Sequence, residues 1–413
     1  MSLRPSVKPG NSGNNGGKAN FGIFGTALKS VSDVVTIPIC PDLVAYRLSL
    51  RPILDKVIGG SQTVTHMKVD RAKIFRQAIS FYKSSRSDTH LQLMITFETD
   101  GVEEEALDGG GVRREFYSTF FKECLKEANM FVGQKRRKMP SNDMTMVQNG
   151  FFEALGRAIV ASILNGDCGF PYLAPVVFYY LTDEDPTPHL SLQDVPDPDI
   201  KALAQNLSAA QSDGEILTIM DSGEASVVDH IGWPPGQAFT MKTKDALVQQ
   251  LIRWSIIDKR MTSLDKLKQG LNHLGFLDAT KKNPLLLPLL VYSSEYKVTA
   301  AYVRNKLMSQ VEGLACKSES QKTSKKFMMD YLKEISDEEA QALFQFITGA
   351  ADPPVEEESI SVDFNSFNNT QKFPEANTCS SKLWIPVGNS NITEFKKSVK
   401  GALDHAKQGF GNS

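Results

Sequence analysis

The sequence has few cysteines, and their arrangement excludes a disulfide framework. Five occur in 413 residues, an odd number at irregular spacing, and no two form a Cys-x-x-Cys pair. This pattern is typical of reduced thiols, so we expect a protein of the cytosol or nucleus with no zinc site. The cysteines are Cys40, Cys124, Cys168, Cys316 and Cys379.

Long apolar runs and an excess of one charge are also missing. The longest strongly apolar run, residues 284–292, is far shorter than a membrane-spanning helix. The first residues lack the regions of a secretory signal. A net charge of −2 leaves no basic footprint for nucleic acid. At 413 residues the chain is long enough for two or three domains, and its 41% hydrophobic residues allow a sizeable core. We expect neither membrane nor nucleic acid as a partner.

The beginning of the chain differs in composition from the rest. Residues 1–33 are rich in Gly, Asn, Ser and Pro and predict a flexible leader, because they bury little apolar surface. Residues 34–66 are more apolar and predict an N-terminal extension that packs on the lobe C-terminal to it. Alternation predicts a strand over residues 90–97. Before it, a helix is indicated by the spacing of Val69, Ile74, Ala78 and Phe81.

Apolar stripes predict helices through the middle of the chain, and we expect these stripes to form a core rather than a cofactor site. Asp108 and the three glycines after it could cradle a phosphate. No Gly-Lys-Ser/Thr follows, so a tight helix entry is favoured. Glu115 and Arg157 are a candidate buried pair with a structural role. The stripes are Phe116, Phe120 and Cys124; Phe152, Leu155, Ile159 and Ile163; and Leu264, Leu267, Leu271 and Leu274.

The last third of the chain predicts a small α/β unit. Ser336 and Glu339 have the spacing of a capping box, and Gly349 fits the end of that helix. Alternation predicts strands at residues 360–364 and 383–385. A final helix is predicted by the stripe Phe395, Val399, Leu403, Ala406 and Phe410.

Cys379 is the most informative residue of this unit. It lies in a short polar segment between two prolines, whereas a buried structural cysteine usually belongs to an apolar pattern. We therefore expect a thiol on an accessible loop that leads into the strand at residues 383–385. Accessibility and thiolate character make a cysteine a nucleophile. Most lone cysteines have no catalytic role, so this pattern alone is weak evidence.

Five segments in order along the chain resemble the HECT-type ubiquitin ligases. FPEANTCSSKLWIP at residues 373–386 is similar to the active-site loop of that family, where Thr-Cys is followed by Leu-x-x-Pro. The final GFGNS resembles its C-terminal tail, with Phe410 fourth from the end. The other similar segments are DGGGVRREFY at 108–117, FFEALGRAI at 151–159 and LFQFITG at 343–349. Five matches together are far more specific than any one of them.

The resemblance implies an α+β, bilobal HECT-like fold. It predicts a large, mostly helical N-lobe at residues 67–295 and a small α/β C-lobe at 296–413, joined by a flexible hinge within about 292–302. A sub-lobe that holds the conjugating enzyme is expected at about 181–240. Five side chains are candidates for exposed anchors that contact this enzyme: Tyr179, Tyr180, Ile219, Met220 and Trp233. For each of them, burial in the core is the alternative.

The resemblance also implies the activity of a ubiquitin-protein ligase. Cys379 would accept ubiquitin from a charged conjugating enzyme as a thioester and pass it to a lysine of a protein substrate. Thr378 would support the loop, and Phe410 would position the cysteine lobe. The implied partners are the charged conjugating enzyme, ubiquitin and a protein substrate, and no cofactor or metal is expected.

Two residues of the loop depart from the family pattern. Asn377 stands where the family usually has His, and Ser380 replaces the usual aromatic residue. Without a neighbouring imidazolium we expect slower transfer rather than none, because a thiol reacts even at a few per cent thiolate. Two alternatives stay open. One is a catalytically degenerate module that binds conjugating enzyme or ubiquitin without a thioester, and the other is a cysteine hydrolase with His405 or His273 as base.

Overall fold

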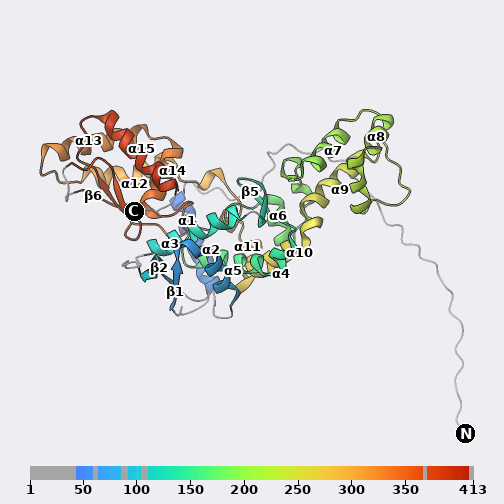
Figure 1. Cartoon of the computed structure of the whole chain (residues 1–413), viewed down its shortest axis with the longest axis horizontal. Coiled ribbons are helices and arrows are strands. Elements are labelled where there is room, and N and C mark those ends of the chain that lie inside the picture. Colours follow the sequence, from blue (N-terminus) through green and yellow to red (C-terminus); the bar gives the residue numbers. More distant parts are fainter. Residues whose placement is uncertain are drawn as a thin grey trace, which may run out of the picture. The chain divides into compact units, whose positions relative to one another are not determined.

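The computed structural model describes residues 43–58, 64–84, 92–99, 101–103, 110–127, 129–365 and 370–408 (Figure 1). The predicted leader at residues 1–33, Asp108 and Phe410 lie outside this part of the chain. The α-helices are α1 Leu43–Ile58, α2 Ile74–Lys83, α3 Gly111–Lys126, α4 Met144–Gln148, α5 Phe151–Leu164, α6 Pro175–Leu181, α7 Pro198–Ala209, α8 Asp213–Met220, α9 Lys244–Ile256, α10 Met261–Leu271, α11 Phe276–Lys282, α12 Ala300–Glu312, α13 Glu319–Glu334, α14 Asp337–Thr348 and α15 Ile392–Gln408.

Short strands and 3-10 helices complete the described chain. The strands are β1 Val64–Asp70, β2 Gln92–Thr99, β3 Val102–Glu103, β4 Phe131–Gln134, β5 Arg137–Pro140, β6 Ser361–Phe364, β7 Glu375–Asn377 and β8 Lys382–Ile385. The 3-10 helices are η1 Arg71–Lys73, η2 Thr187–His189, η3 Leu192–Asp194, η4 Gly223–His230, η5 Asp258–Arg260, η6 His273–Gly275, η7 Pro284–Leu289 and η8 Ser294–Tyr296. The mostly helical chain with small sheets is an α+β fold.

The first sheet corrects one sequence prediction and confirms another. β1 pairs with β2 in parallel, and α2 lies between them in sequence, as the crossover of a parallel pair requires. The helix predicted to include Val69 is wrong at its start, because Met67 and Val69 lie on the buried side of β1 and α2 begins only at Ile74. The strand predicted over residues 90–97 is confirmed in its described part. The buried residues of β2 are Leu93, Ile95 and Phe97.

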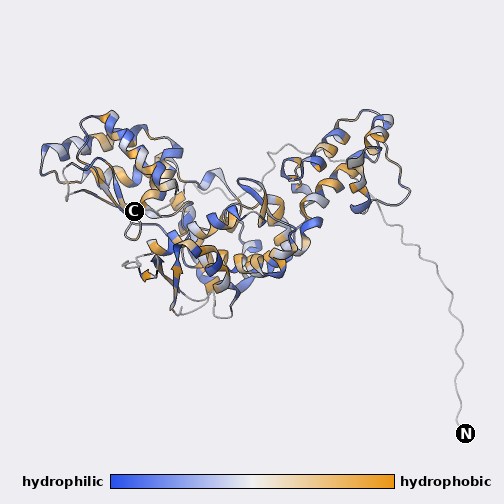
Figure 2. Ribbon diagram, in the orientation of Figure 1, coloured by the Kyte–Doolittle hydropathy of each residue, from blue (hydrophilic) through white to orange (hydrophobic). Residues whose placement is uncertain are grey.

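Two helices of the large core cross very closely. α5 and α10 pack together through the predicted apolar stripes, and both ribbons mix hydrophobic and hydrophilic residues (Figure 2). A Cβ on Gly156 would lie 2.6 Å from Leu271 N, and one on Gly270 would lie 2.2 Å from Glu153 O. Glycine is therefore required at both positions of the crossing. Leu274 departs from the predicted stripe, because it follows the end of α10 with φ of +60°.

Buried apolar side chains form two clusters that divide the chain. The larger cluster contains residues between Leu43 and Tyr296 together with Val355, and it includes one face of α1. The smaller cluster contains residues between Val298 and Leu403. Along the sequence, the change from one cluster to the other falls between Tyr296 and Val298.

The smaller cluster surrounds a three-stranded sheet with the order β6-β8-β7. β6 is parallel to β8, and β7 is antiparallel to it. α14 begins with the predicted capping box, in which Ser336 Oγ accepts from Glu339 N while Glu339 Oε2 accepts from Ser336 N. Gly349 ends this helix with φ of +76°. The capping box, the strands at 361–364 and 382–385 and the helix α15 confirm the sequence predictions for this part of the chain.

Candidate active site around Cys379

Cys379 lies in the short loop between two antiparallel strands. β7 and β8 pair with Asn377 opposite Lys382, so residues 378–381 form the connecting loop. This placement confirms the prediction that the cysteine lies on a loop leading into a strand. The two paired strands fix both ends of the loop. Only the four residues 378–381 lie between them, so the backbone at Cys379 has few conformations available.

The loop is also closed by hydrogen bonds within itself. The Asn377 side-chain oxygen accepts from the backbone N–H of Ser380 at 3.0 Å and from the Ser380 hydroxyl at 3.2 Å. The Ser381 N–H donates to Thr378 O at 3.3 Å. Ser381 has φ of +48°, in the left-handed region that non-glycine residues rarely adopt. Asn377, which replaces the histidine usual in the resembling family, thus closes the loop through its side-chain oxygen.

The loop is packed rather than fully exposed. Thr378 and Ser381 are buried, and Ser381 is only 2% exposed. Cys379 is half-buried and packs against the larger apolar cluster. The thiol predicted to be accessible is therefore only partly so in this arrangement.

The first turn of α3 receives the loop by a very close backbone approach. A Cβ on Gly111 would lie 1.9 Å from Thr378 O and 2.4 Å from Cys379 Cα, both far inside contact distance. Gly110 precedes the helix in the left-handed conformation, with φ of +93°. The glycines that the sequence indicated as a tight helix entry thus also make room for the cysteine loop.

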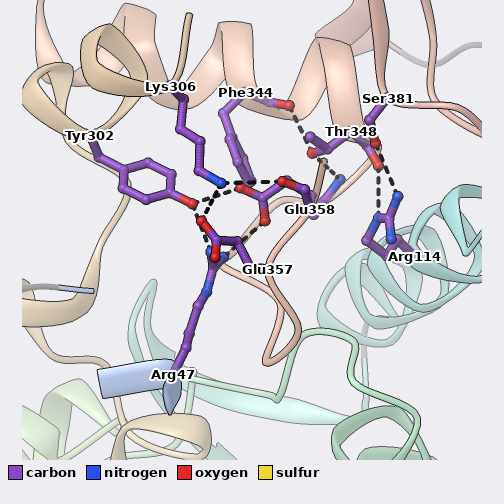
Figure 3. Close-up of polar contacts among 10 residues, drawn as sticks. Arg47, Arg114, Tyr302, Lys306, Phe344, Thr348, Glu357, Glu358 and Ser381 are labelled. Carbon is purple, nitrogen blue, oxygen red and sulfur yellow. Dashed lines mark hydrogen bonds and ion pairs between the residues drawn. The ribbon is translucent and has the colours of Figure 1, made fainter. Parts of the chain in front are cut away.

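Two charged side chains of the same turn hold the loop, and Figure 3 shows one of them, Arg114, with its partners Ser381 and Thr348. Arg114 donates from Nη2 to Ser381 Oγ at 3.0 Å and from Nε to Thr348 O at 3.4 Å. Glu115 accepts from Thr378 Oγ1 at 3.3 Å, and its other carboxylate oxygen lies 2.6 Å from Arg71 Nη1. We call Gly111, Arg114 and Glu115 the α3 seat.

A buried ion pair anchors the same turn of α3. Arg113 Nε lies 2.5 Å from Asp167 Oδ2, and Arg113 Nη2 donates to Asn165 O at 2.7 Å. Burial raises the pKa of Asp167 to about 6, although the Arg113 guanidinium opposes the shift. This arginine thus fixes the start of α3 from within the larger cluster.

Comparison with known proteins identifies the family. The sequence profile of the HECT-domain (ubiquitin-transferase) family matches residues 118–413. The chain belongs to the HECT family. It is also similar to the "G2/M phase-specific E3 ubiquitin-protein ligase" of Homo sapiens and to the protein of the same name from Macaca fascicularis. Each is 20% identical over 348 residues, which are 80% of this chain and 45% of the relative, so the chain spans about half the length of these relatives.

A second polar contact ties the first helix of this HECT-family chain to a segment near the smaller cluster (Figure 3). Arg47 Nη2 lies 3.1 Å from Glu358 Oε2, and Arg47 Nη1 donates to Tyr302 OH at 2.7 Å. The Tyr302 hydroxyl donates to Glu358 Oε1 at 2.6 Å. Lys306 Nζ donates to the Glu358 carbonyl at 3.2 Å and pairs with Glu357 at 2.5 Å. Because the residues of this network are up to 311 positions apart, no local pattern in the sequence indicates it.

The candidate pair of Glu115 and Arg157 is wrong. Arg157 Nη2 instead pairs with Glu153 Oε1 at 2.7 Å, one helical turn earlier in α5. Glu115 pairs with Arg71 and accepts from Thr378. The sequence thus indicates a structural role for Glu115 but not its contact with the loop of Cys379. The only local signal for that contact is the glycine run that opens α3.

The side chains predicted as exposed anchors for a conjugating enzyme are buried or half-buried in this HECT-family chain. Tyr179 is buried and stacks on His189 with ring centroids 3.5 Å apart, so its prediction as an exposed anchor is wrong. The others are half-buried against the larger cluster, and they are Tyr180, Ile219, Met220 and Trp233. Among the described residues of this part of the chain, the large apolar side chains that are exposed are instead Leu217 and Met241.

The two histidines considered as bases lie on different elements. His405 is exposed on α15, and His273 lies in η6, which packs against α1, α5 and α11. Neither placement provides an argument for a cysteine–histidine pair. Within the described ranges, no group of three or more His, Cys, Asp or Glu side chains is arranged to hold a metal ion. None of the described helices is both long and apolar enough to cross a membrane.

Proposed function

We propose that this chain is a ubiquitin-protein ligase that accepts ubiquitin from a charged conjugating enzyme as a thioester on Cys379. A lysine of a protein substrate then takes the ubiquitin in an isopeptide bond. The observation that carries the proposal is the loop of Cys379 docked on the first turn of α3, in a chain whose HECT match extends to its last residue. The similarity to two proteins named as E3 ubiquitin-protein ligases supports the same activity.

Both steps are acyl transfers. In the first, the thiolate of Cys379 attacks the carbonyl carbon of the incoming thioester, and the sulfur of the conjugating enzyme leaves as a thiolate. In the second, a neutral lysine amine attacks the new thioester, Cys379 leaves as a thiolate, and the amine proton passes to solvent. The close approach at Gly111 places the Cys379 backbone beside the first turn of α3. Asn377 and Thr378 contribute by fixing the loop.

We further propose that two lobes act as mobile parts in these steps. The N-lobe would comprise residues 67–295, with the conjugating enzyme bound at about 181–240, and the C-lobe residues 296–413. The two apolar clusters support this division, because the chain changes cluster between Tyr296 and Val298. A hinge there would let Cys379 face the donor first and the acceptor second. Phe410 would position the C-lobe for lysine transfer.

Incubation with activating enzyme, a panel of conjugating enzymes and ubiquitin tests the proposal on non-reducing gels. We expect an adduct that a reducing agent removes, that Cys379→Ala abolishes and that Cys379→Ser converts to an alkali-labile ester. Cys316→Ala is the matched control, because Cys316 is also a half-buried loop cysteine packed against the smaller cluster. An unchanged ligation rate in Cys379→Ala would contradict the mechanism. Ubiquitin binding without any adduct would favour a binding module instead.

A further inference from the structure

A groove with positively charged walls lies between α3, the β4–β5 hairpin and α14. Its volume is about 770 Å³, within the range of about 300–1,000 Å³ that ligand sites usually have. Glu338 is the anionic residue among the described residues that line it. The net charge of the whole chain is −2, so this concentration of positive charge is local. We call this cavity the basic groove, and its cationic residues are Lys122, Lys126, Lys135, Arg136 and Lys138.

The hairpin directs its basic residues to two sides. β4 and β5 are joined by a two-residue turn at 135–136, which projects at the tip. Arg137 belongs to the other side, because its Nε and Nη2 atoms lie 2.5 and 2.6 Å from the carboxylate oxygens of Asp194. Neighbouring residues of a strand face opposite sides, so Lys138 lines the groove. Its Nζ donates to Gly133 O at 2.9 Å, which leaves its charge available to an anion.

Arg136 forms part of the wall of the groove. Its Nη2 lies 2.9 Å from Asp352 Oδ1, and its Nη1 lies 3.2 Å from Asp352 Oδ2. The same guanidinium lies over the rings of Tyr172 and Tyr292, at 4.4 and 4.9 Å from their centroids. Grooves that hold single-stranded nucleic acid stack its bases on aromatic rings. Tyr172 is the aromatic residue among those that line the groove, and Arg136 and Phe170 already contact its ring, so a protein ligand is favoured.

The lysines supply the charge that a ligand can meet. Lys126 pairs with Glu123 at 2.6 Å, in an exposed pair of a kind that contributes little to stability. Lys122 lies one turn before Lys126 and is exposed on α3. Within the described part of the chain, no carboxylate pairs with Lys135, which is exposed at the tip of the hairpin. Because each exposed lysine–carboxylate contact is weak by itself, the groove suits a ligand with several carboxylates in a row.

The groove lies close to the loop of Cys379. Its walls α3 and α14 are the helices that meet this loop, through the α3 seat and through Thr348, which Arg114 joins to Ser381. Ser118 lines the near end of the groove and follows Gly111 by seven residues, which is about 10 Å along the axis of α3. The two walls are joined at this end, because Ala351 N donates to Ser118 Oγ at 3.2 Å.

We propose that the basic groove binds an acidic segment of the protein substrate and presents a nearby lysine to Cys379. This inference rests on the function proposed above and adds the class of substrate. An extended chain advances about 3.3–3.6 Å per residue, so a lysine about three to six residues from the acidic segment would reach the thioester. Gln341 and Gln345 line the wall formed by α14, and their amides suit the backbone groups of such a segment.

Binding is measured in the full chain by the fluorescence anisotropy of a labelled peptide that contains a run of glutamates. The reference is the same peptide with serines in place of the glutamates. We expect the glutamate peptide alone to bind. Its affinity should fall as the salt is raised from about 0.1 M to about 1 M, because the Debye length shrinks from about 10 Å to about 3 Å. Lys122→Ala combined with Lys135→Ala should weaken binding about tenfold.

Two results of this assay would overturn the proposal. Equal binding of the glutamate and serine peptides would mean that the groove does not select acidic segments. Tighter binding of a labelled single-stranded oligonucleotide than of the glutamate peptide would assign the groove to nucleic acid.

Lys322→Ala combined with Lys333→Ala is the matched control. It removes the same charge from two lysines of α13 whose side chains are 60% and 58% exposed and which do not line the groove. This variant should bind the glutamate peptide as wild type does. Equal weakening by the two double variants would show a response to net charge alone and would contradict the groove as the site.

Ubiquitination of the peptides measures the presentation of the lysine. One glutamate peptide carries its lysine about four residues from the run, and another about fifteen residues away. Below saturation, we expect the first to be modified about tenfold faster than its serine counterpart, and the second to gain less. The double variant at Lys122 and Lys135 should lose this preference, whereas the α13 control should keep it. Equal rates at the two spacings would contradict presentation at a fixed distance.

Failure of this inference and failure of the proposed function give different results. If the wild-type chain formed no ubiquitin adduct, the proposed function would fail and the presenting role with it, while the anisotropy would still show whether the groove binds an acidic segment. If the adduct formed but glutamate peptides were modified no faster than serine peptides, the ligase function would stand and the inference would be wrong.

Discussion

Replacing Arg47 by methionine should destabilise the fold far more than the same change at Arg51. Both arginines lie in α1, and each pairs with a glutamate of the segment between α14 and β6. The side chains of Arg47 and Glu358 are 4% and 0% exposed, whereas those of Arg51 and Glu356 are 59% and 51% exposed. Methionine retains much of the apolar stem of arginine, so the comparison isolates the effect of the charge.

Burial determines the expected size of the two effects. Removing one partner of a buried ion pair costs about 3–5 kcal/mol, because the remaining charge is left uncompensated. Glu358 would keep the Tyr302 hydroxyl at 2.6 Å, so we expect the lower end of that range, about 3 kcal/mol, for Arg47→Met. An exposed pair such as that of Arg51 contributes about 0–1 kcal/mol. The difference between the two variants should therefore be about 2 kcal/mol or more.

Urea unfolding followed by circular dichroism measures both free energies. Adding Glu358→Gln to Arg47→Met removes the uncompensated charge and should recover part of the lost stability. The combination of Arg51→Met with Glu356→Gln should change the free energy of unfolding little. If Arg47→Met cost no more than Arg51→Met, the buried network would not join the two parts of the chain as described.

Three further changes have clear expected outcomes. Burial raises the pKa of Asp167 from 3.8 to about 6, so its contribution to stability is present below about pH 4 and is lost as the pH rises through 6. The difference in unfolding free energy between wild type and Asp167→Asn should change by roughly 3 kcal/mol over that window, and a constant difference would contradict the assignment. Gly156→Ala should lower the free energy of unfolding, measured in urea, by about 1–3 kcal/mol, because its Cβ would overlap α10. Gly214→Ala should raise the same free energy by up to about 1 kcal/mol, because its Cβ would meet nothing closer than 3.9 Å. Deleting residues 410–413 should leave thioester formation nearly intact but slow isopeptide formation about tenfold, and equal loss of both with a lower melting temperature would assign Phe410 to packing.

Local signals predicted much of the fold around the candidate site. The capping box of Ser336 and Glu339 depends on a spacing of three residues, and the strand before the final helix depends on alternation, so both can be recognised in sequence. The loop of Cys379 could also be recognised, because the polar residues that indicate it are adjacent to Cys379 in the sequence. Val69 was assigned to a helix because short apolar patterns fit a strand and a helix equally well. Its pairing partner Phe97 in β2, which decides between them, is remote in sequence.

The contacts that join remote parts of the chain, including those that place the loop against α3, could not be predicted from the sequence. Arg47 and Glu358 are 311 residues apart, and Thr378 and Glu115 are 263 residues apart. A glycine run such as that at Gly111 indicates a close approach but does not say which segment approaches. For Arg157 the sequence offered a local partner, Glu153 one turn away, and this i,i+4 pair is the one that forms.

The mass of the adduct on Cys379 is the most direct test of the proposed ligase mechanism. The full chain would be incubated with charged conjugating enzyme and ubiquitin, alkylated at the remaining thiols without reduction, and digested for peptide mass spectrometry. We predict that the peptide containing Cys379 carries the C-terminal glycines of ubiquitin in a thioester that free L-lysine removes. A ubiquitinated chain with Cys379 recovered only as the alkylated thiol, or with the thioester on Cys316, would contradict the assignment of the nucleophile.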